Sequence, residues 1–189
     1  MTLQKTNIRN TVLVLLIVVA TAMRLVSYEY QTFLSNFTPV GAIALFGGAY
    51  FTDKWKAYLV VLTSMFASDI IINQLYNQPF WNAYSLGMYV CFALMVFIGT
   101  FIKKASFVNV FLGSLAGVIV HWLIMDLPFF YGEMYPHTFA GYGESLVAAI
   151  PFEKNMVLGD ALFCTLLFGG FELAKSKYAI LRTNRELAL

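Results

Sequence analysis

Charged residues are scarce in this sequence: Asp, Glu, Lys and Arg make up 12% of the 189 residues, against about 25% in soluble domains. Hydrophobic residues make up 60% and aromatic residues 17%. A soluble fold needs more polar surface than this composition supplies. The composition therefore excludes a soluble protein and predicts a single domain embedded in a lipid bilayer.

Cysteines are few and catalytic motifs are missing. Cys91 and Cys164 both lie in apolar runs, so no disulfide framework is expected. The nucleophile elbow, the His-Glu-x-x-His helix, the phosphate loop and Cys-x-x-Cys are all absent. His121 and Asp126 would diverge by about 140° on a helix, too far to share a metal without distortion. We therefore expect no metal and no cofactor.

Long apolar runs recur along the chain, and about 20 such residues form a membrane span. Six spans are expected, at about residues 10–27, 37–51, 56–75, 83–102, 107–127 and 157–174. The second is short and rich in glycine, so we expect it to be tilted, broken or buried in protein. The predicted fold class is an all-α membrane protein, a bundle of six transmembrane helices.

The positions of the basic residues predict the orientation of this bundle. They lie before the first span (Lys5, Arg9), after the second (Lys54, Lys56), after the fourth (Lys103, Lys104) and after the sixth (Lys175, Lys177, Arg182, Arg185). The positive-inside rule then places both termini in the cytoplasm and the protein in a bacterial inner membrane. Because these residues are topology signals rather than a patch, no nucleic-acid partner is expected.

The first span has a second interpretation. The run "VLVLLIVVATA" after two basic residues, with small residues at Ala20 and Ala22, is also typical of a cleaved secretory signal. The apolar stretch continues to Val26, and the six-span charge pattern is regular, so we expect the span to be retained.

Two of the expected external segments between spans differ from the basic turns. Residues 76–82, "YNQPFWN", carry aromatics and amides without charge. Residues 126–156 form the longest expected loop, and it is acidic. Within it, residues 144–152 are expected to form a short interfacial helix that stops near Pro151.

Polar residues gather at one level of the expected bundle. Asp69 interrupts the apolar run "FASDIIIN", where a charge costs about 2.5–3.5 kcal/mol unless it faces a partner or a cavity. Arg24 is the expected partner of Asp69 or Asp160. The predicted ligand-binding residues in the outer half and its loops are Arg24, Asn36, Asp69, Asn73, Trp81, His121, Trp122, Asp126, Glu144 and Asp160. The alternative is that these residues form structural ion pairs between helices.

The stretch "NFTPVGAIALFGGAYF" (36–51), with "SMFASDIII" and "MVLGDALFCTLLFGGFEL", resembles a bacterial family of six-helix membrane proteins with no assigned function. More remotely, the chain is similar to the substrate-binding S component of energy-coupling-factor (ECF) vitamin transporters. That resemblance implies a vitamin or similar nutrient held in the outer half, and an energising transmembrane subunit with ATPases. The segment "VVATAMRL" (18–25) departs from it, because it lacks the Ala-x-x-x-Ala docking stripe.

Three functions compete at this point. The leading hypothesis is a membrane protein that binds and transports a small nutrient, with a solute, an energising subunit and lipid as partners. The second is a small membrane enzyme that uses His121 with Asp69 or Asp160 as general base and orienting group on a lipid or exported substrate. The third is a scaffold or assembly protein, which predicts a packed bundle without an outer cavity.

Overall fold

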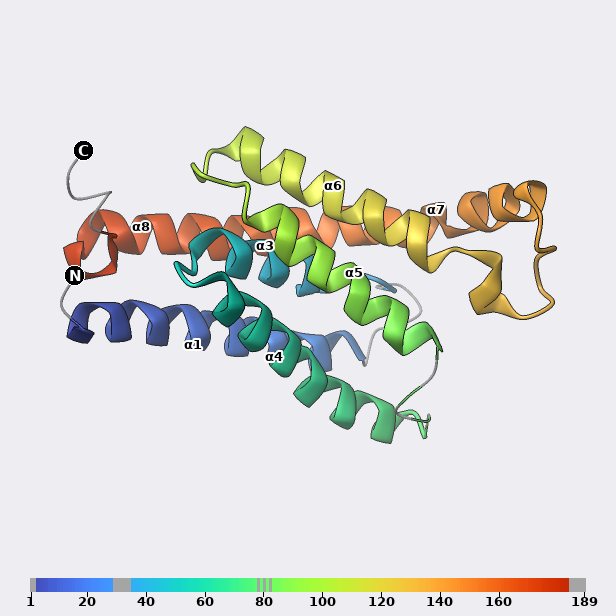
Figure 1. Ribbon diagram of the computed structural model, residues 1–189, viewed down its shortest axis with the longest axis horizontal. Helices are drawn as coiled ribbons and strands as arrows, with labels where there is room; N and C mark the ends of the chain where they lie inside the picture. The colour runs from blue at the N-terminus through green and yellow to red at the C-terminus, as the bar shows by residue number, and fades with distance from the viewer. Residues whose placement is uncertain (1–2, 29–34, 78, 80, 82, 184–189) are drawn as a thin grey trace.

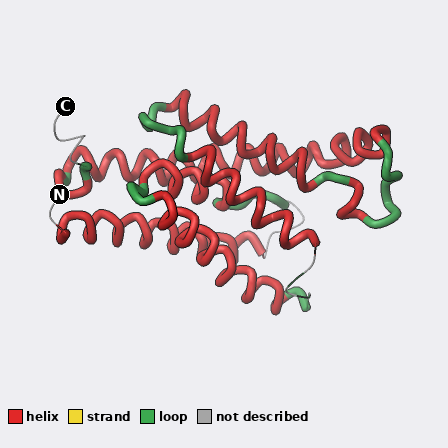
Figure 2. The backbone as a smooth tube through the Cα atoms, in the orientation of Figure 1, coloured by secondary structure: helices red, strands yellow, loops and turns green. Residues whose placement is uncertain are grey.

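The computed structural model describes residues 3–28, 35–77, 79, 81 and 83–183, and its regular structure is helical (Figures 1 and 2). The helices are α1 (Leu3–Tyr28), α3 (Val40–Tyr50), α4 (Lys54–Leu75), α5 (Ala83–Gly99), α6 (Phe107–Met125), α7 (Phe139–Cys164) and α8 (Gly170–Lys177). Short turns lie at η1 (Pro128–Tyr131), η2 (Thr165–Gly169, π-helical) and η3 (Ala179–Leu181). The described residues contain no strand, which confirms the all-α prediction. Positions 78, 80 and 82 of the aromatic segment, and Arg185, lie outside the described residues.

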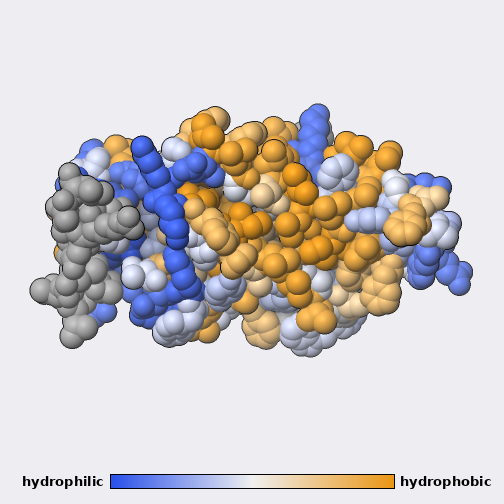
Figure 3. All heavy atoms as spheres, turned by 45° about the horizontal axis from the view of Figure 1, so that its top comes forward, coloured by the Kyte–Doolittle hydropathy of each residue, from blue (hydrophilic) through white to orange (hydrophobic). Residues whose placement is uncertain are grey.

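Four helical stretches are long and apolar enough to cross a membrane: Asn7–Leu25, Lys54–Leu75, Phe107–Met125 and Phe139–Lys177. Helices α3 and α5 are apolar but shorter. Hydrophobic residues cover the middle of the molecule on the face drawn in Figure 3, and hydrophilic residues gather toward its two ends. The chain is therefore a membrane protein. The count of six spans and the cytoplasmic termini stay predictions.

Helix α3 is the centre of the bundle. All of its 11 residues except Ala49 are buried, and it packs against α1, α4, α5, α6 and α7. At 1.5 Å per residue it is about 16 Å long, about half the thickness of a bilayer core. Gly48 and Gly99 let α3 and α5 touch backbone to backbone, since a Cβ on either would collide with a carbonyl oxygen of the other helix. Of the three alternatives expected for the second span, tilted, broken or buried in protein, burial is the one found.

Helix α7 corrects the expected loop over residues 126–156. It begins at Phe139, where the Thr138 side chain accepts a hydrogen bond from the Gly141 amide, and it runs through Pro151 without ending. With η2 and α8 it forms one helical stretch of 39 residues, Phe139–Lys177, or about 58 Å. The connection after α6 is therefore limited to residues 126–138, and residues 144–152 are part of the long helix rather than a separate interfacial one.

Helix α1 begins and α8 ends at the same end of the bundle (Figure 1). The basic side chains of Arg9 and Lys54 hold this end together. The buried Arg9 guanidinium donates to the carbonyl oxygens of Leu181 (3.0 Å) and Tyr50 (2.6 Å). Lys54 donates in the same way to two carbonyls at the end of α3. This end is therefore tightly closed, and the opposite end, where α6 leads through η1 into α7, holds the candidate site.

Candidate functional site

A cavity of about 340 Å³ lies among the ends of α5 and α6, the turn η1 and the first half of α7. We call it the polar cavity. Its lining residues are Asn36, Tyr84, His121, Met125, Asp126, Tyr131, Met134, Tyr135, Ser145, Ala148, Ala149, Phe152 and Glu153. Three of the predicted ligand-binding residues, Asn36, His121 and Asp126, are among them. Asn36 has a left-handed backbone (φ 63°), which is tolerated better by Asn than by most residues.

A buried imidazole–carboxylate pair joins α6 to α7 at this cavity. His121 Nδ1 lies 3.0 Å from Glu153 Oε1, and both side chains are almost completely buried. The other carboxylate oxygen of Glu153, Oε2, is buried and has no hydrogen-bond partner among the described residues. An unsatisfied buried carboxylate oxygen is costly. Because Oε2 has almost no accessible surface, a donor in the cavity would reach it after the Glu153 side chain turns toward the cavity.

A second carboxylate is held at the end of α6. The Tyr131 hydroxyl donates to Asp126 Oδ1 over 2.7 Å, and the Ser145 hydroxyl donates to the backbone carbonyl of Asp126 over 2.6 Å. Burial raises the pKa of the Asp126 carboxyl above its usual range, and the hydrogen bond from Tyr131 offsets part of that rise. Burial and the bond to Asp126 likewise raise the pKa of Tyr131, so its hydroxyl stays a donor at neutral pH.

Arg24 and Asp69 pair with each other but do not line the polar cavity. Arg24 Nη1 lies 2.8 Å from Asp69 Oδ1, and Arg24 also donates to the Ser68 hydroxyl. The Tyr89 hydroxyl donates to Asp69 Oδ2 over 2.8 Å. The pairing of Arg24 with Asp69, one of the two expected options, is thus the one found. It ties α1, α4 and α5 together, so these two predicted ligand-binding residues lie apart from His121 and Asp126.

Asp160 is completely buried beneath the first turn of α3. Its Oδ2 accepts from the Ser114 hydroxyl over 3.0 Å. A Cβ on Gly41 would lie 2.5 Å from Asp160 Oδ1, so only glycine fits above the carboxylate. The residue before α3, Pro39, provides no side-chain cap, and a carboxylate near a helix N-terminus is favourable. Asp160 therefore stabilises the N-terminus of α3 and does not line the polar cavity.

The four other predicted residues also lie outside the lining of the polar cavity. The half-buried Trp122 donates its indole N–H to the Leu146 carbonyl over 3.0 Å, which clamps α6 to α7. Trp81 is exposed and its ring lies 5.8 Å from that of Tyr89. Asn73 is half-buried on α4, and Glu144 is exposed on α7.

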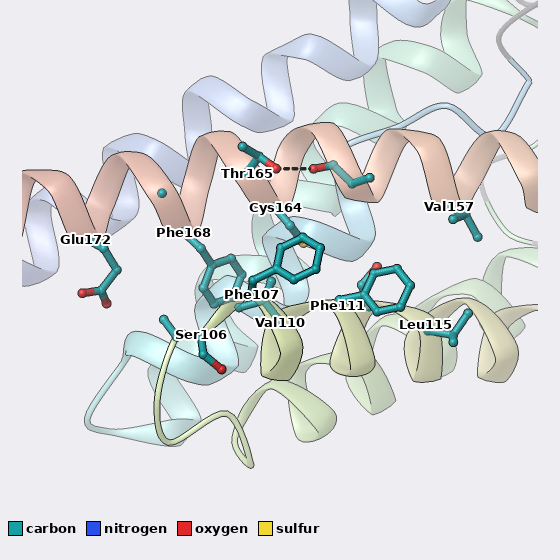
Figure 4. Close-up of a pocket in the computed structure, with 14 residues that line it drawn as sticks. Ser106, Phe107, Val110, Phe111, Leu115, Val157, Cys164, Thr165, Phe168 and Glu172 are labelled. Carbon is teal, nitrogen blue, oxygen red and sulfur yellow. Dashed lines mark hydrogen bonds between the residues drawn. The ribbon is translucent and has the colours of Figure 1, made fainter.

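Two further hollows lie along the sides of the bundle. The apolar groove, about 380 Å³, runs between α6 and the stretch from α7 to α8, with Phe107 and Phe111 on one wall and Phe168 on the other (Figure 4). The α1–α4 groove, about 390 Å³, is lined mainly by small or aliphatic side chains, including Ala22, Ser64 and Ala67. Neither brings charged groups together as the polar cavity does, so we take the polar cavity as the candidate site.

Glu153 is the main residue of the candidate site that is absent from the predicted ligand-binding residues. The sequence places it in the expected acidic loop over residues 126–156, just after the point near Pro151 where the short helix is expected to stop. A signal was nevertheless present: Gly141, Ser145, Ala149 and Glu153 follow one another at intervals of four and form the buried face of α7. That spacing indicates a helix with these four residues on one face. The three small residues approach α6, and the fourth residue of the series is the carboxylate.

Comparison with curated proteins and with solved structures finds no match. Among the described residues, no three His, Cys, Asp or Glu side chains are grouped to hold a metal ion. One family model matches residues 4–183, nearly the whole chain. The chain therefore belongs to the family described as "Family of unknown function (DUF6580)".

Proposed function

We propose that this protein binds a small solute in the polar cavity and serves as the binding component of an uptake system in a bacterial inner membrane. The observation that supports this most is the cavity itself, where His121, Asp126 and Glu153 meet in about 340 Å³. Small-molecule sites have volumes of about 300–1,000 Å³, with mostly apolar walls and a few convergent polar groups. The aromatic and methionine side chains of the lining match that description.

The proposal includes an energising partner, as in the ECF transporters that the sequence resembles. A transmembrane subunit coupled to ATPases would contact the flank of the bundle, with lipid around it. The first span lacks the Ala-x-x-x-Ala stripe, but Ala22 on α1 and Ser64 and Ala67 on α4 line the α1–α4 groove. Small side chains allow close approach of another helix, which supports this groove as the contact surface.

The enzyme hypothesis has one observation in its favour. An imidazole 3.0 Å from a carboxylate is the geometry of a general base with its orienting group. The partner carboxylate is Glu153, whereas Asp69 and Asp160 are bonded elsewhere. Such a base could activate a water molecule directly, but the methionine and phenylalanine side chains of the lining have no part in that chemistry. Solute binding therefore accounts for more of the cavity than catalysis does.

Retention of a solute tests the proposal. The full chain would be purified in mild detergent from cells grown in rich medium, denatured, and its extract analysed by mass spectrometry. We expect one compound to be enriched with the wild type and with Asn73→Ala, whose side chain lies outside the cavity, and to be lost from His121→Ala. Absence of any enriched compound, together with unchanged nutrient uptake after deletion of the gene, would contradict the proposal.

A further inference from the structure

The unpartnered oxygen of Glu153 is the first clue to the class of solute. The residue is 5% exposed and lines the polar cavity, and only Oε1 is engaged, by His121 Nδ1. Oε2 has no donor among the described residues. A carboxylate oxygen accepts hydrogen bonds and cannot donate while ionised, so the missing partner is an N–H or O–H donor. A charged donor would compensate the buried charge best.

The charge of the lining points the same way. The described lining residues include two carboxyl groups, on Asp126 and Glu153, one imidazole, on His121, and neither Lys nor Arg. With both carboxylates ionised, the net charge is −2 with a neutral imidazole (−1 −1 + 0) and −1 with an imidazolium (−1 −1 + 1). Both states attract a cation and repel an anion. Arg24 is paired with Asp69 on another side of the bundle, and Lys154, which follows Glu153 on α7, is exposed and does not line the cavity.

The walls distinguish an organic cation from a metal ion. Tyr84, Tyr131, Tyr135 and Phe152 line the cavity with Met125 and Met134. The rings of Tyr131 and Tyr135 lie edge to face, with centroids 5.4 Å apart. Aromatic faces attract ammonium groups, and thioethers adapt to apolar bodies. A hard metal ion needs several oxygen ligands instead, and no such group is formed by the described residues.

We infer that the polar cavity binds a small organic cation, a protonated amine on an apolar body, with its N–H groups donating to the carboxylates of Glu153 and Asp126 and its body against the tyrosine rings. This inference rests on the proposed function and names its solute class. A protonated primary amine fits better than a quaternary ammonium, because only the former supplies the donor that Glu153 lacks. Hydrogen bonds that involve charged groups are stronger than those between neutral groups. Glu153 should therefore contribute more than the other lining residues to the preference for a protonated amine.

Three probes with one aromatic body and different charge test the inference: 2-phenylethylamine (cation), its N-acetyl derivative (neutral) and 3-phenylpropionate (anion). Binding to the full chain in detergent would be followed by thermal stabilisation and by calorimetry. We expect the amine alone to bind and stabilise the wild type. Glu153→Gln keeps the shape and removes the charge, so it should weaken amine binding by at least about tenfold. Glu144→Gln, an exposed carboxylate on the same helix, is the matched control and should bind like the wild type.

The outcomes separate the solute class from the proposed function. If the neutral or anionic probe binds as well as the amine, and Glu153→Gln abolishes that binding, the cation inference is wrong while the cavity remains a solute site. If none of the probes binds and no compound co-purifies, both are wrong. Asp126→Asn provides the second variant should Glu153→Gln fail to elute as a single folded species. It should weaken amine binding in the same direction, and unchanged affinity for the amine in both variants would overturn the inference.

Discussion

Replacing Arg24 by Gln should destabilise the folded chain, because it leaves Asp69 without its cation inside a membrane span. The two side chains are 11% and 20% exposed, and Nη1 lies 2.8 Å from Oδ1. Asp69 would keep only the hydrogen bond from the Tyr89 hydroxyl, 2.8 Å away. Arg24 lies near the end of α1 and has the Ser68 hydroxyl as a second partner, so loss of Asp69 should be tolerated better.

The expected loss in the free energy of unfolding differs between the two variants, because Asp69 depends more on the ion pair than Arg24 does. Breaking a buried ion pair costs about 3–5 kcal/mol, and an acidic residue in a membrane helix about 2.5–3.5 kcal/mol. With the Tyr89 bond retained and partial exposure, we expect the lower end, about 2–3 kcal/mol for Arg24→Gln. For Asp69→Asn we expect about 1–2 kcal/mol, because the arginine can extend toward water. The double variant should cost at least about 1 kcal/mol less than the sum of the single variants, since two amides restore a neutral pair.

The assay is unfolding of the full chain in mixed micelles, followed by the far-UV circular dichroism of its helices, with thermal midpoints as a second readout. One kcal/mol corresponds to about 2–4 °C for a chain of this size. The exposed pair of Lys56 and Asp53, 34% and 48% exposed, is the control, and Lys56→Gln should cost under about 0.5 kcal/mol. The reasoning would be refuted if the loss for the double variant equalled the sum of the losses for Arg24→Gln and Asp69→Asn within about 0.5 kcal/mol. It would also be refuted if Lys56→Gln cost as much as Arg24→Gln.

Three further predictions concern packing, orientation and pH. Gly48→Ala should lower the free energy of unfolding by about 1–3 kcal/mol, because the added Cβ meets a backbone carbonyl of α5. Gly143→Ala, in open space on α7, is the control and should be neutral or stabilising. Equal effects of the two substitutions in the same assay would contradict the close crossing of α3 and α5. A membrane-impermeant maleimide should label Glu144→Cys in intact cells and Lys104→Cys only after permeabilisation; the reverse pattern would invert the orientation. Because the pKa of Asp126 is raised by folding, the folded state binds its proton more tightly, so wild-type stability should fall relative to Asp126→Asn as pH rises above the ordinary value of 3.8; a pH-independent difference in thermal midpoint would show otherwise.

The helices were predictable because a membrane helix satisfies its own backbone hydrogen bonds and needs only an apolar surface. The burial of α3 was also predictable, since glycines such as Gly48 remove the side chains that keep helices apart. The first half of α7 was not. Pro151 and the acidic Glu144 and Glu153 have the composition of a loop. The helix persists because a stripe of small residues packs against α6 and because the buried Glu153 meets His121.

The sequence predicts which types of residue line the candidate site better than it predicts which charged side chains pair with each other. Depth along the chain predicts His121 and Asp126, and these two residues line one cavity together with Asn36. The pairing of charges depends on the rotation of each helix, where one residue changes direction by about 100°. Depth alone therefore placed Asp69, Asp160 and His121 at one level, although each contacts a different neighbour.

Asp69, Asp160 and Glu153, three carboxylates within the helices of the bundle, differ in what completes their surroundings, and this difference is the strongest argument for a solute. Asp69 is completed by Arg24 and Tyr89. Asp160 also has an oxygen without a hydrogen bond, but that oxygen lies against Gly41 in the first turn of α3, where the helix dipole favours a negative charge and no room is left. Glu153 alone combines an unpartnered oxygen with a position in the wall of a cavity. A fold that needed Glu153 only to hold α6 against α7 would gain nothing from the space beside it, so the space and the carboxylate are best explained together, by a donor that enters from outside the protein.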